Sequence, residues 1–253
     1  MKQHNLSYQG SKLLLYLRSG LHFLIIISST LVYCPLIIAA WFLPFSVRYQ
    51  LSNQWVGLVL WSTKIICKLD YVVHGLENIP TNNNGIILSK HQSAWETIAL
   101  QKIFPPQIFL MKRELLWMPF WGWAMAALKP IAINRKAQKT ALRILIEQGT
   151  ARLNEGLWVV IFPEGTRTSP GERRKFNAGG ALLAERSGFP VVPVAHNAGE
   201  FWPRYSFVKY PGTIQVRVGP VIDSTGRKAV DINQEVEHWI SNTMKEISTQ
   251  ERK

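Results

Sequence analysis

LWVVIFPEGTR, residues 157–167, is the stretch that says most about the fold, because an apolar run passes directly into a polar turn. A short apolar run that ends in turn residues is typical of a buried strand. Three other apolar runs are each followed at once by a basic side chain: GIILS (85–89), QIFLM (107–111) and PIAIN (130–134). The chain therefore repeats one arrangement, a buried strand with charged residues at its carboxyl end.

Outward from these runs, the hydrophobic pattern predicts strands alternating with helices. The seven expected strands are 71–74, 85–89, 107–111, 130–134, 157–162, 190–195 and 213–218. The four expected helices are 93–103, 138–154, 178–187 and 232–248. Such alternation predicts an α/β domain with a single sheet flanked by helices. Because neither a repeat nor a low-complexity linker interrupts the pattern, we expect one domain over residues 70–253.

The polar clusters that follow the strands are expected to meet. Parallel strands present their carboxyl ends at one edge of a sheet, and open α/β sheets bind ligands there. If the four runs quoted above are parallel strands, that edge carries a histidine, at least two glutamates and at least four cations. The residues concerned are Lys90, His91, Glu96, Lys112, Arg113, Glu114, Arg135, Glu164 and Arg167.

The segment His91-Gln-Ser-Ala-Trp-Glu96 holds a candidate base. Residues five apart do not share a helix face, so the two side chains meet only if His91 lies in a loop and Glu96 in the first helical turn. Ser93 would then be the N-cap, with Ser93-x-x-Glu96 forming a capping box. A histidine oriented by a carboxylate is suited to general base catalysis. A plain helix cap and an ordinary loop histidine are the alternatives.

The PEGTR turn holds a candidate phosphate site. Arg167 offers a planar guanidinium that matches phosphate, and Gly165 permits a tight turn and close approach of the backbone. Thr166 adds a hydroxyl, and Glu164 can either hold Arg167 or contact a glycerol hydroxyl. A turn with a solvated arginine is the alternative.

Further cations follow other strands or lie in a loop. Lys112 and Arg135 each end a strand, and RRK (173–175) forms a basic loop able to meet lipid headgroups or the phosphates of a carrier. Each cation is individually explained as well by simple solvation, although convergence at one edge favours a shared role. The Trp-rich segment 115–128 suits a wall for an acyl chain or a membrane-facing edge, with core packing as the alternative.

Residues 1–69 differ in character from the rest of the chain. The run LHFLIIISSTLVYCPLIIAAWFLPF (21–45) holds no charged residue and exceeds the about 20 residues that a helix needs to cross a bilayer core. A signal peptide would also fit its basic flank, which consists of Lys2, Lys12 and Arg18. The run is too long for a signal peptide, however, and no A-x-A-like cleavage site follows it. We therefore expect a membrane anchor, and leave open whether the interrupted run crosses both leaflets.

A second N-terminal stretch, residues 51–69, places apolar side chains at helical spacing. Lys64 and Lys68 lie off most of that stripe. The pattern predicts an amphipathic helix at the membrane interface. A helix packed on the domain is the alternative.

The composition restricts the class of partner. The 253-residue chain is 47% hydrophobic and carries a net charge of +13, which indicates an anionic partner: phosphate groups, a lipid surface or nucleic acid. The chain has ten tryptophans, a residue that favours interfaces with one apolar and one wet side. Cys34 and Cys67 have no zinc-site spacing, and we expect no disulfide between them. No nucleic-acid motif is present, and a nucleic-acid partner would leave the apolar N-terminus unexplained.

Together, and in this order, the motifs resemble the glycerolipid acyltransferase family, which includes 1-acyl-sn-glycerol-3-phosphate acyltransferases. The family's blocks are a His followed by four residues and an acid, a Lys-x-Glu-Leu stretch running to an Arg, the sequence FPEGTR, and an apolar run with a Pro. Their counterparts here are His91 and Glu96; Lys112, Glu114, Leu115, Pro119, Gly122 and Arg135; residues 162–167; and Val191-Val-Pro193-Val. One residue departs from the pattern, since Glu96 stands where the family usually has Asp. The extra methylene demands a different approach to His91.

The resemblance implies transfer of a fatty acyl group from acyl-CoA or acyl-carrier protein to the free hydroxyl of 1-acyl-sn-glycerol-3-phosphate, giving phosphatidic acid. It implies that His91 acts as general base, oriented by Glu96, without a metal or other cofactor. The implied substrate-binding residues are Lys112, Arg135, Glu164, Gly165, Thr166 and Arg167. It also implies a place on the inner membrane, in contact with membrane lipids and not with nucleic acid, with the catalytic domain on the cytoplasmic side.

Other readings of the sequence stay open. The acceptor can be another lysolipid, or the chain can be a non-catalytic basic protein that binds membrane lipid. Within the enzyme class, a covalent route would need an activated serine or cysteine. Ser89 and Ser93 lie near His91 in sequence, but there is no G-x-S-x-G elbow.

Overall fold

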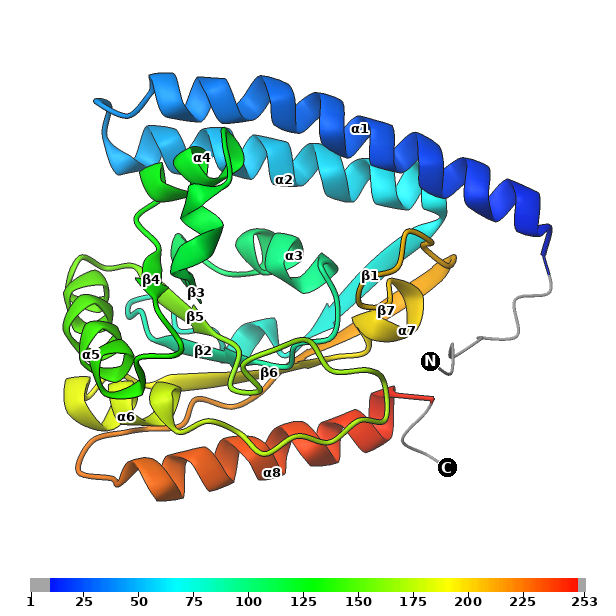
Figure 1. Ribbon diagram of the computed structural model, residues 1–253. Helices are drawn as coiled ribbons and strands as arrows, with labels where there is room; N and C mark the ends of the chain where they lie inside the picture. Colours follow the sequence, from blue (N-terminus) through cyan, green and yellow to red (C-terminus); the bar gives the residue numbers. More distant parts are fainter. Residues whose placement is uncertain (1–9, 250–253) are drawn as a thin grey trace.

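The computed structural model describes residues 10–249 (Figure 1). Lys2 of the predicted basic flank lies outside them. The strands are β1 (Leu69–His74), β2 (Ile86–Ser89), β3 (Gln107–Lys112), β4 (Ile131–Ile133), β5 (Trp158–Ile161), β6 (Val191–His196) and β7 (Gly212–Val218). The α-helices are α1 (Lys12–Ala39), α2 (Phe45–Cys67), α3 (Trp95–Ile103), α4 (Trp121–Ala127), α5 (Gln138–Asn154), α6 (Gly179–Ser187), α7 (Ala198–Phe201) and α8 (Ala229–Ile247). Two 3-10 helices are η1 (Leu76–Asn78) and η2 (Arg113–Trp117).

All seven predicted strands and all four predicted helices are confirmed, with ends that differ by at most three residues. The strands form one seven-stranded sheet in the order β1-β7-β6-β2-β5-β3-β4. β6, β2, β5, β3 and β4 are mutually parallel, whereas β7 runs antiparallel to β6 and parallel to β1. The condition for the polar clusters to meet therefore holds, because β2, β3, β4 and β5 end at one edge.

Both faces of the sheet are covered, because alternate side chains of a strand point to opposite faces. In β2, Ile86 and Leu88 pack in the core formed with α5, α6 and α8. Ile87, between them, packs in the core formed with α2 and α3. Figure 1 shows the same layers, with α8 below the sheet and the α1–α2 pair above it.

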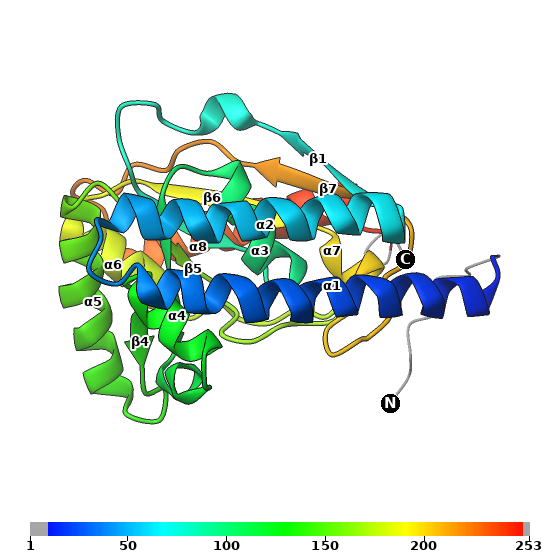
Figure 2. The same cartoon turned by 90° about the horizontal axis from the view of Figure 1, so that it is seen from above.

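α1 and α2 form an antiparallel hairpin that lies across the domain (Figures 1 and 2). Ser11 is the N-cap of α1, and its Oγ accepts a hydrogen bond from the Leu14 N–H (3.4 Å); the helix contains Pro35. α2 buries Val56 and Leu60 against α3 and the sheet. For residues 51–69, the structure therefore agrees with the alternative prediction, a helix packed on the domain.

The Trp-rich segment forms η2 and α4, two short helices that the strand–helix alternation did not predict. Ala124 and Ala127 of α4 pack against Cys34 and Ile37 of α1. Part of the segment thus follows the core-packing alternative. Its other large side chains remain at the surface, since Trp117, Met118, Phe120 and Trp123 are exposed.

Candidate active site

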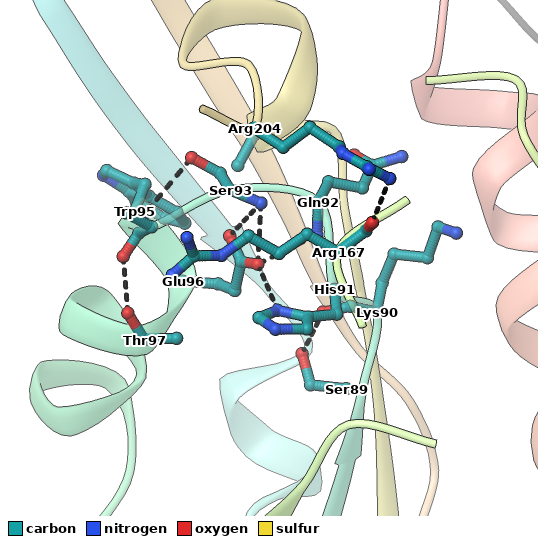
Figure 3. A network of polar contacts seen from close by, with 12 residues as sticks. Ser89, Lys90, His91, Gln92, Ser93, Trp95, Glu96, Thr97, Arg167 and Arg204 are labelled. Atoms are coloured by element: carbon teal, nitrogen blue, oxygen red, sulfur yellow. Dashed lines mark hydrogen bonds and ion pairs between the residues drawn. The ribbon is translucent and has the colours of Figure 1, made fainter. Parts of the chain in front are cut away.

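His91 and Glu96 meet in the way their spacing predicts. His91 lies in the loop after β2, and Glu96 lies in the first turn of α3. His91 Nδ1 is 2.8 Å from Glu96 Oε1 (Figure 3). The Glu96 carboxylate can only accept when ionised, so Nδ1 donates and Nε2 is the nitrogen left to accept a proton.

Glu96 also holds the backbone of the loop that carries His91. Its Oε1 accepts hydrogen bonds from the N–H groups of Gln92 (2.9 Å) and Ser93 (2.8 Å). The back-bond of a capping box is therefore present, although the N-cap position belongs to Ala94 and not, as predicted, to Ser93. One carboxylate thus contacts the imidazole of His91 and also secures the start of α3.

The charge of Glu96 is maintained in a fully buried position. Burial by itself raises the pKa of Glu96, but attraction to His196 and the hydrogen bonds from His91 and the Ser93 N–H outweigh it, so the pKa lies below its ordinary value. His196, at the carboxyl end of β6, has its Nε2 3.9 Å from Glu96 Oε2 and donates from it to the Lys90 carbonyl (2.9 Å). Burial lowers the pKa of His196. Its imidazole is thus a fixed donor behind the site.

A second buried network lies beneath His91. Lys90 Nζ forms an ion pair with Glu164 Oε1 and also donates to Thr168 Oγ1 (3.0 Å). Glu164 Oε2 accepts the His91 N–H (2.8 Å), and the His91 carbonyl accepts the Thr168 N–H (2.8 Å). Burial raises the pKa of Glu164 against the attraction of Lys90. Glu164 therefore bonds to the residues around the base and not to Arg167.

The residue before the PEGTR turn packs directly on the base. The ring of Phe162 stacks on His91, with 4.0 Å between centroids and 15° between planes. Gly165 adopts φ +71°, a conformation that favours glycine, and its carbonyl accepts a hydrogen bond from Arg135 Nη1. β4 and β5 are separated in the sheet by β3. Arg135 thus links the end of β4 to the turn that follows β5.

The predicted cations occupy the carboxyl edge but are not equally close to His91. Arg167 is half-buried, and its Nε has no hydrogen-bond partner within residues 10–249. Thr166 is also half-buried. Lys112 is exposed at the end of β3, where its Cα pairs with Ile133 of β4. Figure 3 draws His91, Glu96 and Arg167 in one region, whereas Lys112 is exposed at the end of its strand.

Sequence reasoning missed four contributors to this region: Lys90 as an ion-pair partner, Thr168, His196 and Arg204. His196 ends a predicted parallel strand, so the rule that led to His91 would also have found it. Arg204 carried no such signal, because it lies in an irregular loop after α7. Its Nη1 donates to the Arg167 carbonyl at 2.5 Å.

The arrangement is suited to proton abstraction beside an anion. A buried carboxylate orients an imidazole, whose second nitrogen can take a proton from a substrate hydroxyl. Arg167 supplies a guanidinium that matches phosphate. A serine nucleophile is disfavoured by the geometry, because Ser89 and Ser93 are fully buried and their hydroxyls bond to the backbone of Lys90 and Trp95.

Comparison with known proteins agrees with this chemistry. Residues 70–197 match the family described as Acyltransferase, so the chain belongs to that family and is an acyltransferase. The resemblance predicted from the four sequence blocks is thereby confirmed.

Within that family, the chain is 47% identical over 237 residues to the 1-acyl-sn-glycerol-3-phosphate acyltransferase of Pseudomonas aeruginosa, covering 92% of each chain. It is 29% identical over 200 residues to the 1-acyl-sn-glycerol-3-phosphate acyltransferase alpha of Bos taurus, covering 77% of this chain and 70% of the relative. The crystal structure of the 1-acyl-sn-glycerophosphate (LPA) acyltransferase of Thermotoga maritima matches with a TM-score of 0.72 at 23% identity, over 91% of this chain and 96% of that one. This last match confirms the fold.

Proposed function

We propose that the chain transfers a fatty acyl group from acyl-CoA or acyl-carrier protein to the free hydroxyl of 1-acyl-sn-glycerol-3-phosphate, forming phosphatidic acid in phospholipid biosynthesis. The observation that carries the proposal is the His91–Glu96 pair beside Arg167. The chain that carries this pair is also 47% identical to a relative named 1-acyl-sn-glycerol-3-phosphate acyltransferase.

His91 acts as the general base in this proposal. The acceptor hydroxyl gives its proton to Nε2 while its oxygen bonds to the carbonyl carbon of the thioester. Collapse of the tetrahedral intermediate breaks the C–S bond, and the imidazolium returns the proton to the departing thiolate. Proton transfer of this kind contributes about 10²–10⁴-fold to the rate. Glu96 stabilises the imidazolium and holds its orientation.

Arg167 binds the phosphate of the acceptor, assisted by Lys112 and Arg135 at the same edge. Gly165 and Thr166 lie in the turn beside it and complete the acceptor site. Glu164 contributes by holding the His91 backbone, which its contact with the His91 N–H supports. The rigid support matters because misplacement of a catalytic group by about 1 Å can cost on the order of 10²-fold in rate.

An apolar hollow between α1, α2 and α4 supports a place for an acyl chain. Its space of about 340 Å³ includes open solvent. Its lining consists of Thr30, Tyr33, Cys34, Ile37, Ser52, Trp55, Trp121, Ala124, Met125 and Leu128. Four residues of the Trp-rich segment, Trp121, Ala124, Met125 and Leu128, therefore border a hollow of the apolar character that an acyl chain requires.

Residues 1–69 attach the enzyme to the membrane in this proposal, and residues 70–253 carry the chemistry. α1 is long and apolar enough to cross a membrane, with a mean hydropathy of 2.2 over an 18-residue window of which 22% is buried. A core helix would be mostly buried, so this exposure supports lipid contact. α2 adds Trp61 and Ile65, which are exposed. The membrane is the inner membrane, with the catalytic residues on its cytoplasmic side.

The proposal is tested with purified, detergent-solubilised protein given 1-acyl-glycerol-3-phosphate and a long-chain acyl thioester of CoA or of acyl-carrier protein. Phosphatidic acid is the expected product, detected by mass spectrometry. Transfer to another lysolipid with none to 1-acyl-glycerol-3-phosphate would contradict the acceptor. Binding of anionic vesicles with no transfer to any lysolipid would contradict catalysis and favour the lipid-binding alternative.

A further inference from the structure

The loop between α7 and β7, residues 202–211, lies outside the region that matches the family, residues 70–197. It nevertheless reaches the active site. Arg204 Nη1 donates to the backbone carbonyl of Arg167 at 2.5 Å, and Figure 3 draws this contact next to the His91 loop. A hydrogen bond from a charged donor is among the stronger ones in proteins.

The backbone at Arg167 is held from two sides. On one side, Arg204 binds the carbonyl of residue 167. On the other, the N–H of Thr168 donates to the His91 carbonyl at 2.8 Å. The peptide group between residues 167 and 168 therefore has both its acceptor and its donor engaged. The first bond fixes it to the α7–β7 loop and the second to the catalytic loop.

Arg204 also faces the loop that follows Arg167. Its Nη1 is 3.8 Å from Glu172 Oε2, and the same oxygen accepts the Ser169 N–H at 2.9 Å. One guanidinium thus contacts both ends of the segment from residue 167 to residue 172. Its side chain is 33% exposed, so solvent can replace part of these contacts if it is removed.

The α7–β7 loop is itself fixed to α1. The Lys209 N–H donates to Ser19 Oγ at 3.0 Å, and the ring of Phe207 meets that of Phe23 edge to face at 5.6 Å. The loop that carries Arg204 is therefore anchored to α1. This chain of contacts runs from α1 through Arg204 to the backbone of Arg167.

We propose that Arg204 is a positioning residue for binding of the acceptor phosphate, acting through the backbone of Arg167. The inference rests on the proposed function, in which Arg167 holds that phosphate. Arg204 needs no contact with the substrate. Its removal frees the peptide at residue 167, so the Arg167 side chain approaches the phosphate with greater conformational freedom.

The test is a double-mutant cycle of acyl transfer with Arg204→Met, Arg167→Ala and both changes together. We expect Arg204→Met to raise the KM for 1-acyl-glycerol-3-phosphate by about tenfold and to leave kcat and the thioester KM unchanged, since one charge-assisted hydrogen bond is lost. In the Arg167→Ala background, the same change should have no further effect. Arg204→Lys, which keeps a charged donor, should recover part of the affinity.

Arg186→Met is the matched control, because Arg186 is an exposed arginine in the last turn of α6 and loses the same charge. It should leave every kinetic constant unchanged. Thermal unfolding of each variant, with Arg204→Gln as a second neutral replacement, separates loss of fold from loss of positioning.

If Arg204→Met raised the acceptor KM as much in the Arg167→Ala background as in the wild type, the inference would be overturned, because Arg204 would then act independently of Arg167. A fall in kcat at unchanged acceptor KM would also overturn it. In both cases the wild type still transfers acyl groups, so the proposed function stands. No transfer by the wild type to any lysolipid would overturn the proposed function together with the inference.

Discussion

His91 Nδ1 lies 2.8 Å from Glu96 Oε1, and the same carboxylate oxygen accepts the N–H groups of Gln92 and Ser93. One fully buried carboxylate therefore sets both the orientation of the imidazole and the path of the loop that carries it. The extra methylene of glutamate, where the family usually has aspartate, is accommodated within this geometry.

Glu96→Asp should lower kcat on the order of 10- to 100-fold, because the shorter side chain cannot keep its backbone donors and also reach Nδ1. The measurement is steady-state acyl transfer, with Glu77→Asp in the exposed η1 as a control for the same change. Full activity of Glu96→Asp would show that this distance does not set the orientation of the base.

Glu96 should also make stability depend on pH in a defined direction. Its folded pKa lies below the ordinary value of 4.5, so its ionised form stabilises the folded state. That contribution is fully present above pH 4.5 and is lost as the pH falls through the folded pKa. The free energy of unfolding of wild type relative to Glu96→Gln, measured by denaturant titration, should therefore shrink on acidification below that range. A difference that grows as the pH falls would contradict the assignment.

Arg167→Ala should raise the KM for the acceptor by about 10- to 100-fold, the effect of losing hydrogen bonds between opposite charges. The thioester KM should stay the same. Arg186→Ala provides the control for charge alone. An effect confined to the thioester substrate would assign Arg167 to the donor and not to the acceptor phosphate.

The sequence predicted the sheet well because its strands are short apolar runs buried on both faces, such as residues 86–89. It predicted the meeting of His91 and Glu96 for the same reason, since strand direction and helix start determine where they lie. Strand order does not follow from such local patterns. β1 ends at His74 and β7 begins at Gly212, 138 positions later, yet the two strands pair in the folded sheet.

The remaining site residues could not be predicted because their roles depend on tertiary contacts. The sequence pattern places Glu164 in a turn, yet folding buries it against Lys90, 74 positions earlier. Arg204 acts on Arg167 only because the α7–β7 loop folds back over the PEGTR turn. The Trp-rich segment was ambiguous for a related reason. Its residues form short helices whose packing against α1 is decided by the fold and not by local periodicity.

Exposed leucines on α1 should be needed for membrane binding. Leu17, Leu24 and Leu31 lie seven residues apart on one side of the helix and are 61%, 63% and 63% exposed. Burial of one such side chain contributes about 1.5–3 kcal/mol, so changing all three to Gln should weaken vesicle binding by more than about tenfold. The measurement is co-sedimentation with vesicles that contain anionic lipid.

Val230→Gln is the control for this experiment, because Val230 is 63% exposed on α8, on the opposite side of the sheet from α1 (Figure 1). It should bind vesicles as the wild type does. Equal binding by the triple variant and the wild type would contradict the role of α1 as the anchor.

The most direct test of the central claim is acyl transfer to 1-acyl-glycerol-3-phosphate by the wild type and by His91→Ala, each shown to be folded and to bind vesicles equally. If His91 is the general base, the wild type forms phosphatidic acid and the variant does so at a rate lower by about 10²–10⁴-fold, because the base is lost while the substrates still bind. Unchanged transfer by His91→Ala would show that the base, and with it the proposed mechanism, is wrong.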